Sequence, residues 1–533
     1  MDLQRIELRN FRCFRDFTLD VNGEPLLVIG PNAGGKTSLV TGIRRALQGG
    51  SVELRELRDQ TIPIELIATV SGIPPAAQGD FADVLDFGTT PPTLRIGLRA
   101  AWDAAELRVD TVHGFPDAGW RPARREARRN LPVISLPSWR DPARLLPVVG
   151  RQSLLQELVV GLPLDQALTT AVTAITDAGE QLAHAQPLQQ LLSELRDELD
   201  RVLPKVAPNA FSLGLDVAQP HDVLDQLELL LVHRGPATPA STHSGGVTQA
   251  TMFALALRLL AARPDALLLV DEPESALHPQ AQRALVAALR ATAHQSVIAT
   301  HSAMVLDRLD PRHVTRLRRA AAGDTEAVRA SGLTADGARK VSRYATSQTA
   351  EAYFAETVIV VEGFSDLLAV RALARKLGIN LDAAGVSLIS LEGATLFQHY
   401  LQLLGPAGLE VELRGLVDDD HEADWMARLN AAGIAVIDRA TLKAAGFHVC
   451  DPDLEAELVA PLSAQDVEAV FDGDGALGEF RTFAGQPQQA GLAVADVQMR
   501  FIKKDKVRWA PLLADAVPVA AVPAPIVDLL SNL

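Results

Sequence analysis

The residues of this chain whose types and spacing suit chemistry begin with a glycine-rich segment at 30–37, Gly-Pro-Asn-Ala-Gly-Gly-Lys-Thr. The segment matches the full P-loop pattern and lies between an expected strand and an expected helix. Its glycines let backbone N–H groups turn toward phosphate oxygens, and the helix adds its positive N-terminal end. Lys36 would reach the β- and γ-phosphates of ATP, and Thr37 would ligate Mg²⁺. The alternative is an ordinary glycine-rich turn. The nucleotide-binding residues that we expect are Gly30, Asn32, Gly34, Gly35, Lys36, Thr37 and Ser38.

A buried apolar run at 266–270 leads into two acidic residues that complement this segment. Asp271 would hold the Mg²⁺ shell, and Glu272 would polarise the attacking water. After one helix, a second apolar run ends in His301, which is well placed to sense the γ-phosphate. A single histidine at a strand end is more often structural, but this one has the spacing that such ATPases use. We therefore expect a Mg²⁺-dependent ATPase site.

The segment Ser244-Gly245-Gly246 lies at the start of another expected helix and would form a second phosphate nest. It resembles the signature motif of the ATP-binding-cassette (ABC) ATPases, although His243 and Val247 depart from the usual Leu-Ser-Gly-Gly-Gln form. In that family the motif contacts the nucleotide held by a second subunit, so the resemblance implies a dimer. The N-terminal run at 8–14 is similar to the start of RecF-, SMC- and Rad50-type ATPases.

A second set of acidic residues follows strands in the last third of the chain. Glu362 follows an expected strand at 358–361, Asp366 lies four residues later, and a third strand leads into Asp418, Asp419 and Asp420. Carboxylate oxygens suit Mg²⁺ or Mn²⁺, and the carboxyl ends of parallel strands meet at one edge of a sheet. Strand alternation would place Asp418 and Asp420 on one side and Asp419 on the other. The alternative is a solvated acidic loop. The pattern is that of a Toprim domain.

An ABC-type ATPase with a helical insertion, followed by a Toprim domain, resembles the OLD (overcoming lysogenization defect) nuclease family, whose relatives include the Gabija nuclease subunit and retron-associated nucleases. The resemblance implies an ATP-binding and ATP-hydrolysing DNA endonuclease that uses two divalent metals about 4 Å apart and acts in anti-phage defence. Implied cofactors are ATP and Mg²⁺, with Mn²⁺ or Ca²⁺ as alternatives at the nuclease site. The first metal would be held by Glu362, Asp366, Asp418 and Asp420.

The same resemblance assigns roles to two later segments. Asp453 and Glu455 would contribute to a second metal, although acidic residues are also common at ordinary helix N-termini. Lys506 would stabilise charge on the scissile phosphate or the leaving oxygen, and Lys503 or Lys504 could hold that role instead.

The elements that position these residues form an α/β chain. We expect an ABC/RecF-like ATPase domain in two parts, interrupted by a helical insertion that carries dimer contacts. Its leucine stripe, between residues 188 and 202, could instead be plain core. A linker and a C-terminal Toprim domain follow, the latter with strands at 358–361, 386–390, 412–417 and 434–437. The expected boundaries are 1–149 and 236–320 for the ATPase, 150–235 for the insertion, 321–350 for the linker and 351–533 for the Toprim domain.

Charge and composition limit the partners. The chain has 533 residues and a formal charge of −16, of which residues 351–533 contribute −14 from 27 acidic and 13 basic residues. Such acidity argues against DNA unless the acids hold cations. The most basic run, 121–129, would contact phosphates or form a solvated helix face. Two cysteines, no signal-peptide-like start and short apolar runs favour a soluble cytoplasmic protein with no membrane partner.

Two classes of function remain from the sequence. The first is the ATP-regulated nuclease, acting on DNA as a homodimer or higher oligomer, with an accessory defence protein as an optional partner. The second is an ATP-switched DNA-binding clamp or DNA-repair scaffold of RecF/SMC type, with a non-catalytic Toprim domain. A topoisomerase is disfavoured because Tyr344, Tyr353 and Tyr400 lack a persuasive context for a nucleophile.

Overall fold

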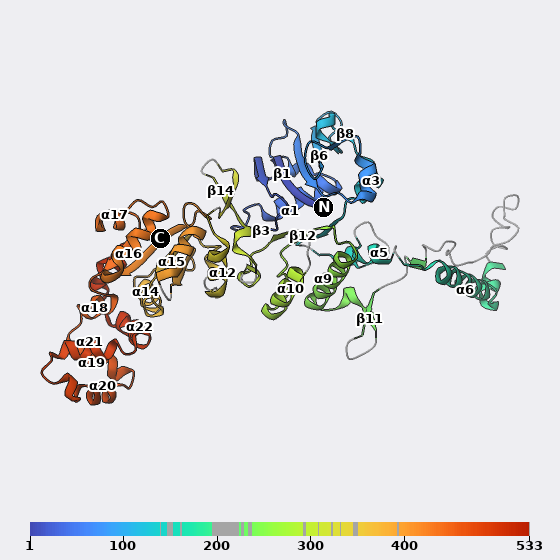
Figure 1. The fold of residues 1–533 in the computed structure, drawn as a ribbon. Coiled ribbons are helices and arrows are strands. Elements are labelled where there is room, and N and C mark those ends of the chain that lie inside the picture. Colours follow the sequence, from blue (N-terminus) through green and yellow to red (C-terminus); the bar gives the residue numbers. More distant parts are fainter. Residues whose placement is uncertain are drawn as a thin grey trace. The chain divides into compact units, whose positions relative to one another are not determined.

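The computed structural model (Figure 1) describes residues 1–533 apart from 139, 147–152, 160–161, 194–222, 225–228, 233–236, 292–294, 307–308, 321–322, 331, 345–349, 392–393 and 532. The chain forms two compact units. The first comprises Met1–Pro137, Asp265–Glu274 and Pro279–Leu533. The second comprises Ser138–Pro264 and Ser275–His278.

The N-terminal part of the first unit is an antiparallel sheet with the strand order β2-β1-β4-β6-β7-β8, to which β5 adds by pairing with β6. In β1, Leu3, Ile6 and Leu8 are fully buried, and a register shift between Leu3 and Arg5 interrupts the strict alternation of the strand. The strands are β1 Asp2–Phe11, β2 Phe14–Asp20, β4 Ile64–Ser71, β5 Leu85–Asp86, β6 Thr93–Asp103, β7 Arg108–Phe115 and β8 Arg121–Pro122.

A second sheet carries the P-loop and has the order β15-β14-β3-β13-β12-β9. Its strands are parallel except β15, which pairs antiparallel with β14. Every residue of β3 is buried, as the apolar run at 26–29 predicts. Helix α1 (Lys36–Gln48) packs Leu39, Ile43 and Leu47 into the same core. The other strands are β3 Leu26–Ile29, β9 Val133–Leu136, β12 Leu267–Asp271, β13 Ser296–Ala299, β14 Val314–Arg319 and β15 Thr325–Arg329.

The segment expected to be a linker is more ordered than its composition indicates. It contains β15, which extends the P-loop sheet, and helix α12 (Ala335–Tyr344). On the neighbouring strand, the guanidinium of Arg316 is buried and donates hydrogen bonds to three backbone carbonyls of the Toprim part, those of Ala355 (3.0 Å), Leu409 (3.3 Å) and Glu410 (3.2 Å). Arg318 on the same strand pairs with Glu410 at 2.7 Å, so β14 joins the ATPase sheet to the Toprim part through two arginines.

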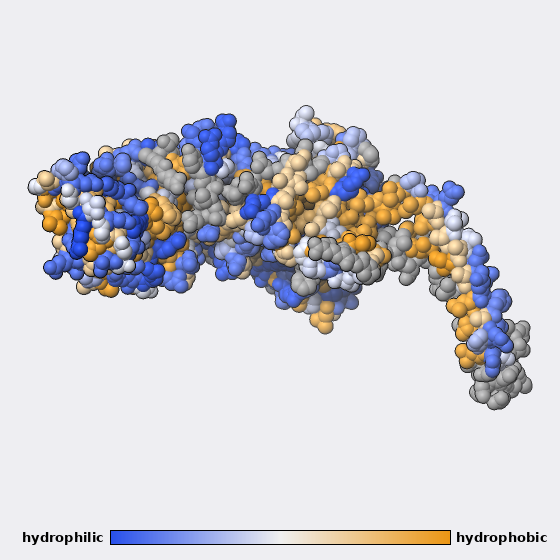
Figure 2. Space-filling model, turned by 90° about the horizontal axis from the view of Figure 1, so that it is seen from below, coloured by the Kyte–Doolittle hydropathy of each residue, from blue (hydrophilic) through white to orange (hydrophobic). Residues whose placement is uncertain are grey.

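The second unit contains the described part of the expected helical insertion, including helices α5 (Leu154–Val159) and α6 (Asp165–Ala183). Half of the predicted leucine stripe, Leu195, Leu199 and Val202, lies outside the described residues, and Leu188, Leu191 and Leu192 lie within them. Apolar residues are exposed in this unit (Figure 2): 55% of Leu162, 57% of Leu182 and 47% of Leu191 is accessible to solvent.

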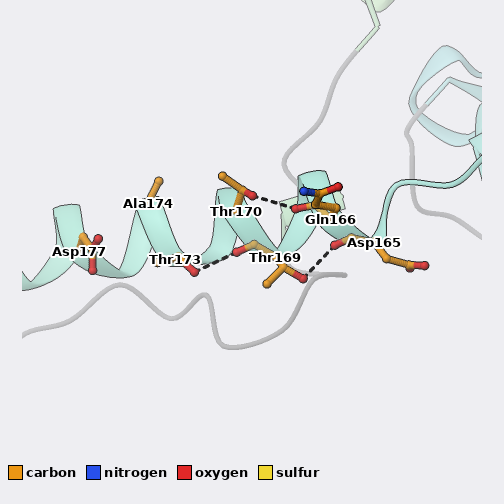
Figure 3. A pocket seen from close by; sticks show the side chains of 7 residues that line it. All are labelled: Asp165, Gln166, Thr169, Thr170, Thr173, Ala174 and Asp177. Atoms are coloured by element: carbon orange, nitrogen blue, oxygen red, sulfur yellow. Dashed lines mark hydrogen bonds between the residues drawn. The ribbon is translucent and has the colours of Figure 1, made fainter.

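A hollow along α6 is lined by threonines whose hydroxyls donate to backbone carbonyls four residues earlier in the same helix, for example Thr169 to Asp165 at 2.8 Å (Figure 3). Their protons are therefore used within the helix. In the same unit, α9 (Gly245–Ala262) has the length and apolar composition of a membrane span, but the core helix of a soluble protein meets the same criteria.

The Toprim part is a parallel sheet with the order β17-β16-β18-β19. Its first three strands lie where the sequence predicts them: β16 Thr357–Val361, β17 Val386–Ser390 and β18 Glu412–Asp418. The expected strand at 434–437 is wrong, because the fourth strand is β19 (Phe447–Cys450). The amide of Asn430 bonds both backbone groups of Val436, which holds that segment as a loop, and 82% of Ile437 is exposed.

A helical layer completes the Toprim part. Helix α14 packs against α22 (Figure 1). A core of aromatic and aliphatic side chains, including Phe471, Phe501 and Trp509, is shared by these and the neighbouring helices. The helices are α14 Phe364–Lys376, α15 Ala394–Leu404, α16 Glu422–Ala431, α17 Arg439–Ala444, α18 Leu454–Val459, α19 Ala464–Gly473, α20 Leu477–Ala484, α21 Val494–Ile502, α22 Lys506–Ala516 and α23 Ala524–Leu529.

Candidate functional site

The P-loop follows β3 and has the backbone that a phosphate cradle requires. Gly30 has φ +147°, and a Cβ there would lie 2.4 Å from the Leu317 carbonyl oxygen. Gly35 has φ +101° at the N-cap of α1, and a Cβ there would lie 2.7 Å from Cys13 Sγ. Both positions therefore need glycine for conformation and for space. Gly34 has an ordinary φ, but a Cβ there would lie 2.9 Å from the Pro31 carbonyl oxygen.

Lys36 is held inside this loop. Its ammonium donates to the carbonyls of Gly30 at 2.8 Å and Pro31 at 2.9 Å, and only 5% of the residue is exposed. Burial lowers the pKa of Lys36 to about 8, against the opposing effect of nearby acids. Thr37 is exposed at the start of α1, so its hydroxyl is accessible to a ligand.

The predicted acids and the histidine gather around Lys36. Asp271, the last residue of β12, and Glu272 both act electrostatically on Lys36. His301 reaches the surface of this site. Partial loss of solvent around its ring, together with the Lys36 charge, lowers its pKa, and Glu272 opposes this shift. The structure thus brings P-loop, strand-end acids and histidine together.

Glu274 is a residue of this site whose role the sequence did not reveal. Its carboxylate accepts from the His301 backbone N–H at 2.6 Å and from the Thr300 hydroxyl at 2.8 Å. It therefore fixes the turn that presents His301. The only sequence signal was its place as the third acid of the run Asp-Glu-Pro-Glu.

The predicted signature segment belongs to the second unit. Ser244 is the N-cap of α9, and both Ser244 and Gly245 are exposed. A Cβ on Gly246 would lie 3.1 Å from the Ala276 carbonyl oxygen. The N–H groups of a helix start are thus accessible, as a phosphate nest requires.

The Toprim acids meet at the carboxyl ends of neighbouring strands. Glu362 follows β16, and its carboxylate accepts from the Asp418 backbone N–H at 3.0 Å and from His421 Nδ1 at 2.8 Å. Asp366 is buried in the first turn of α14 and accepts from the Gly363 N–H at 2.8 Å. Asp418 ends β18 and accepts from the Leu454 N–H at 3.2 Å.

Strand alternation does not decide where Asp420 points, because β18 ends at Asp418 and residues 419–421 form a 3-10 turn. The Asp420 carboxylate lies 3.3 Å from His421 Nδ1 and is 77% exposed, so His421 bridges Asp420 and Glu362. Asp419 instead pairs with Arg439. His421 is a second residue whose role the sequence did not reveal; its place directly after three aspartates was the available signal.

The later acids complete the edge. Asp453 is the N-cap of α18, accepts from the Ala456 N–H at 2.9 Å and pairs with Lys503 at 2.5 Å. Glu455 is fully buried and pairs with Lys506 at 2.7 Å through Oε2. Lys504 lies 4.0 Å over the Phe483 ring. Of the three lysines, Lys506 is therefore the one bonded to the buried acid and acting on Asp366 and Asp418.

The electrostatics of this cluster show an excess of negative charge. Burial, reinforced by Glu455, raises the pKa of Asp366 to about 6 against the Gly363 N–H bond. Burial and the charges of Asp366, Glu362 and Glu455 raise the pKa of Asp418 to about 7, although Lys506 opposes this. Burial would lower the pKa of Lys506, but its bond to Glu455 and the charges of Glu455, Asp418 and Asp453 together raise it.

These residues fit a divalent cation in charge and donor type. Glu455 Oε1 is buried and has no hydrogen-bond partner within the described structure, so one anionic oxygen is uncompensated. Hard cations take carboxylate ligands of this kind. Across the described ranges, however, no three such side chains are already arranged to hold a metal. Lysines, His421 and backbone N–H groups hold the oxygens instead.

The basic run at 121–129 forms β8 and the short helix α3 (Arg125–Arg129). Arg121 pairs with Asp83 at 2.6 Å, whereas Arg124 and Arg125 are exposed. Exposure agrees with both predicted roles, a phosphate contact and a solvated helix face.

Two family models match the chain. Residues 26–307 match "AAA domain, putative AbiEii toxin, Type IV TA system", and residues 353–420 match "Overcoming lysogenization defect protein-like, TOPRIM domain". An OLD nuclease of Thermus scotoductus is 25% identical over 423 residues, which is 73% of this chain and 77% of the relative. The uncharacterized protein YbjD of Escherichia coli is 25% identical over 250 residues, 46% of this chain and 41% of its own length.

Solved structures also match. The C-terminal region of the Xanthomonas campestris pv. campestris OLD protein is 29% identical, with a TM-score of 0.28, over 34% of this chain and 92% of that one. An Smc head domain from Pyrococcus furiosus is 14% identical, with a TM-score of 0.39, over 64% and 98%. The chain therefore belongs to the matched AAA-domain family, whose model covers more than half of it, and this ATPase domain is joined to an OLD-like TOPRIM domain.

Proposed function

We propose that this protein binds and hydrolyses ATP and cleaves DNA phosphodiester bonds with divalent metal ions, Mg²⁺ or Mn²⁺. One observation carries the nuclease half: acids from the ends of three adjacent parallel strands meet around a buried carboxylate oxygen of Glu455 that lacks a partner in the described structure. At neutral pH such a cluster must be balanced by bound protons or by cations. The relationship to an OLD nuclease supports the same reaction.

At the nuclease site, Glu362, Asp366, Asp418 and Asp420 would hold one metal, and Asp453 and Glu455 would contribute to a second. Bound divalent ions would supply activation of water and neutralisation of charge at the scissile phosphate. Lys506 stays protonated through its bond to Glu455 and places a positive charge beside the same acids. That charge would stabilise the leaving oxygen.

At the nucleotide site, the P-loop amides and Lys36 would bind the phosphates, and Thr37 and Asp271 would hold Mg²⁺. Glu272 would orient the attacking water, and His301, fixed by Glu274, would sense the γ-phosphate. Ser244, Gly245 and Gly246 would contact nucleotide held by a second copy of the chain.

The biological setting that we propose is anti-phage defence by a cytoplasmic homodimer or higher oligomer. Apolar side chains exposed on the helical insertion, such as Leu162 and Leu182, support an association surface there. Both cysteines are free thiols, in keeping with a reducing compartment.

The alternative function is an ATP-switched DNA clamp with a non-catalytic Toprim part. One observation favours it: within the described residues no group of side chains is preassembled around a metal. This alternative predicts ATP hydrolysis and DNA binding without strand cleavage.

Plasmid nicking decides between the two. Supercoiled DNA is incubated with the full chain and Mg²⁺ or Mn²⁺, using wild type, Asp418→Asn and Asp424→Asn. Asp418→Asn keeps the shape but removes the charge of this half-buried carboxylate, so we expect nicking to fall by at least about 100-fold. Asp424 pairs only with Arg428 in the described structure, and its variant should nick like wild type. Equal activity in both variants, or none in wild type, contradicts the proposal.

A further inference from the structure

The Toprim site is built on two turns that come from different strands. We define the β18 turn as residues 418–422 and the β19 turn as residues 451–455. The β18 turn carries Asp418 and Asp420, and the β19 turn carries Asp453 and Glu455. The distance between the two proposed metals therefore depends on how these turns are held together. This inference rests on the proposed function.

We propose that Arg439 is the positioning residue that holds the two turns in register. It is the first residue of α17, which precedes β19 in the chain. Its guanidinium contacts three carboxylates, two on the β18 turn and one on the β19 turn. On the β18 turn, Nη2 pairs with Asp419 and also with Glu422 at 2.5 Å, and Nε donates to Glu422 at 3.0 Å. On the β19 turn, Nη1 lies 3.5 Å from the Asp451 carboxylate.

None of these three partners is a proposed metal ligand, but each is close to one in sequence. Asp419 lies between Asp418 and Asp420, and Asp451 lies two residues before Asp453. The planar guanidinium donates in several fixed directions at once, so it sets angles as well as distance. A pull on either turn is thus transmitted to the acids beside it.

Two backbone-level contacts also join the turns: the Asp419 N–H donates to the Pro452 carbonyl at 3.2 Å, and the Leu454 N–H donates to Asp418 at 3.2 Å. Among the described charged groups, Arg439 is the cation that bridges them through acids. Without it, Asp419, Glu422 and Asp451 would add like-charge repulsion to a site already rich in carboxylates.

Arg439 is itself fixed at both ends of its helix. Asp438 caps α17 by accepting from the Thr441 N–H at 2.8 Å. At the other end, Lys443 pairs with Asp528 at 2.5 Å. The arginine is therefore presented from an anchored helix rather than from a free loop, which is what a positioning role needs.

Arg439 is partly exposed, which distinguishes a role in positioning the metal ligands from a role in the stability of the fold. Its side chain is 48% exposed, and Asp451 is 66% exposed. Exposed ion pairs contribute little to folding. Loss of Arg439 should therefore change metal affinity more than thermal unfolding.

The test compares wild type with Arg439→Met, Arg439→Lys and the control Arg375→Met in the full chain. Arg375 is also an exposed arginine paired with an acid, Asp515, but it lies in the last turn of α14, away from the strand ends that carry the acids. Calorimetry with Mn²⁺ gives affinity directly, and the Mn²⁺ dependence of plasmid nicking gives a second readout. Thermal unfolding without metal reports on folding.

We expect Arg439→Met to bind Mn²⁺ about 10-fold more weakly and to need correspondingly more Mn²⁺ for half-maximal nicking. Arg439→Lys keeps the charge but loses the fork and should give an intermediate value. Arg375→Met should match wild type. If Arg439→Met does not fold, Arg439→Lys provides the same comparison.

Unchanged Mn²⁺ affinity in Arg439→Met overturns the inference, as does an equal loss in Arg375→Met. Wild type that binds Mn²⁺ but does not nick DNA contradicts the proposed function, while the binding data still test the role of Arg439. Wild type that binds no Mn²⁺ overturns both.

Discussion

The nucleotide site is built mainly from backbone, whereas the Toprim site is built from side-chain carboxylates. At the P-loop, Lys36 bonds two carbonyls, and glycines keep the loop free of side chains. At the Toprim edge, Lys506 bonds the carboxylate of Glu455, and more acids surround it. The first arrangement suits an anion and the second suits cations. We therefore propose that the first site binds a phosphate mainly through backbone N–H groups and that the second acts on a phosphate through metal ions.

Burial disfavours the charged form of a key side chain at both sites, a cation at the P-loop and an anion at the Toprim edge. It lowers the pKa of Lys36 to about 8 and raises the pKa of Asp418 to about 7. In each case burial shifts the protonation equilibrium toward the neutral form, and a partner of opposite charge shifts it back. Ligand binding at either site should therefore change protonation.

The largest expected effect tests whether the two sites are separable. Lys36→Met removes the cation that would meet the γ-phosphate, so ATP hydrolysis should fall by roughly 100-fold or more. Phosphate release measures this, with Lys340→Met on α12 as the control for an exposed lysine. Mn²⁺ affinity at the Toprim site should stay at the wild-type value. A parallel loss of Mn²⁺ binding would contradict the separation of the sites.

We expect a smaller effect, on Mn²⁺ affinity, when the buried carboxylate of Glu455 is changed. Glu455→Gln keeps the shape but removes the charge that holds Lys506, so Mn²⁺ affinity should fall by about 10-fold or more. Calorimetry with Mn²⁺ measures it. Glu457→Gln, two residues later on the same helix, is the matched control. If both variants bind Mn²⁺ equally, Glu455 is not part of the metal site.

The smallest expected effect is on stability as pH changes. Asp366 and Asp418 have pKa values of about 6 and about 7, above their ordinary value, so the folded protein binds protons more tightly than the unfolded chain. Their contribution is therefore present at low pH and is lost as pH rises toward 7. Mn²⁺, which needs the ionised acids, should raise the unfolding temperature by a few degrees more at pH 8 than at pH 5.

Scanning fluorimetry at the two pH values, with and without Mn²⁺, measures this difference. In Asp418→Asn the difference between pH 8 and pH 5 should shrink, because one of the two raised groups is gone. An equal shift at both pH values would mean that the cluster does not bind the metal through these acids.

Much of both sites follows from the sequence because strand ends are local features. The apolar runs at 26–29 and 358–361 are strands in the structure, and Gly30 and Glu362, directly after them, lie at the sheet edges. The P-loop pattern likewise needs only its own residues and the elements that flank it. The position of a short buried strand and of the polar residue after it can therefore be predicted from the local sequence alone.

The rest depended on partners distant in sequence. The run at 434–437 is apolar enough for a strand, but Asn430 satisfies its backbone as a loop. Asp420 could not be oriented because the strand ends two residues earlier. Glu274 and His421 gain their roles only through contacts made in three dimensions.

The contact made by Arg316 has a consequence for how this molecule tolerates mutation. Its guanidinium bonds carbonyls of residues 355, 409 and 410, and carbonyls are present whatever side chains those residues carry. Arg316 also lies opposite Ile29, the residue before Gly30, in the pairing of β14 with β3. Substitutions on the Toprim side of this junction are therefore silent for these bonds, whereas a single codon on the ATPase side controls all of them. These three bonds therefore depend on one residue, and that residue pairs with the strand that leads into the P-loop.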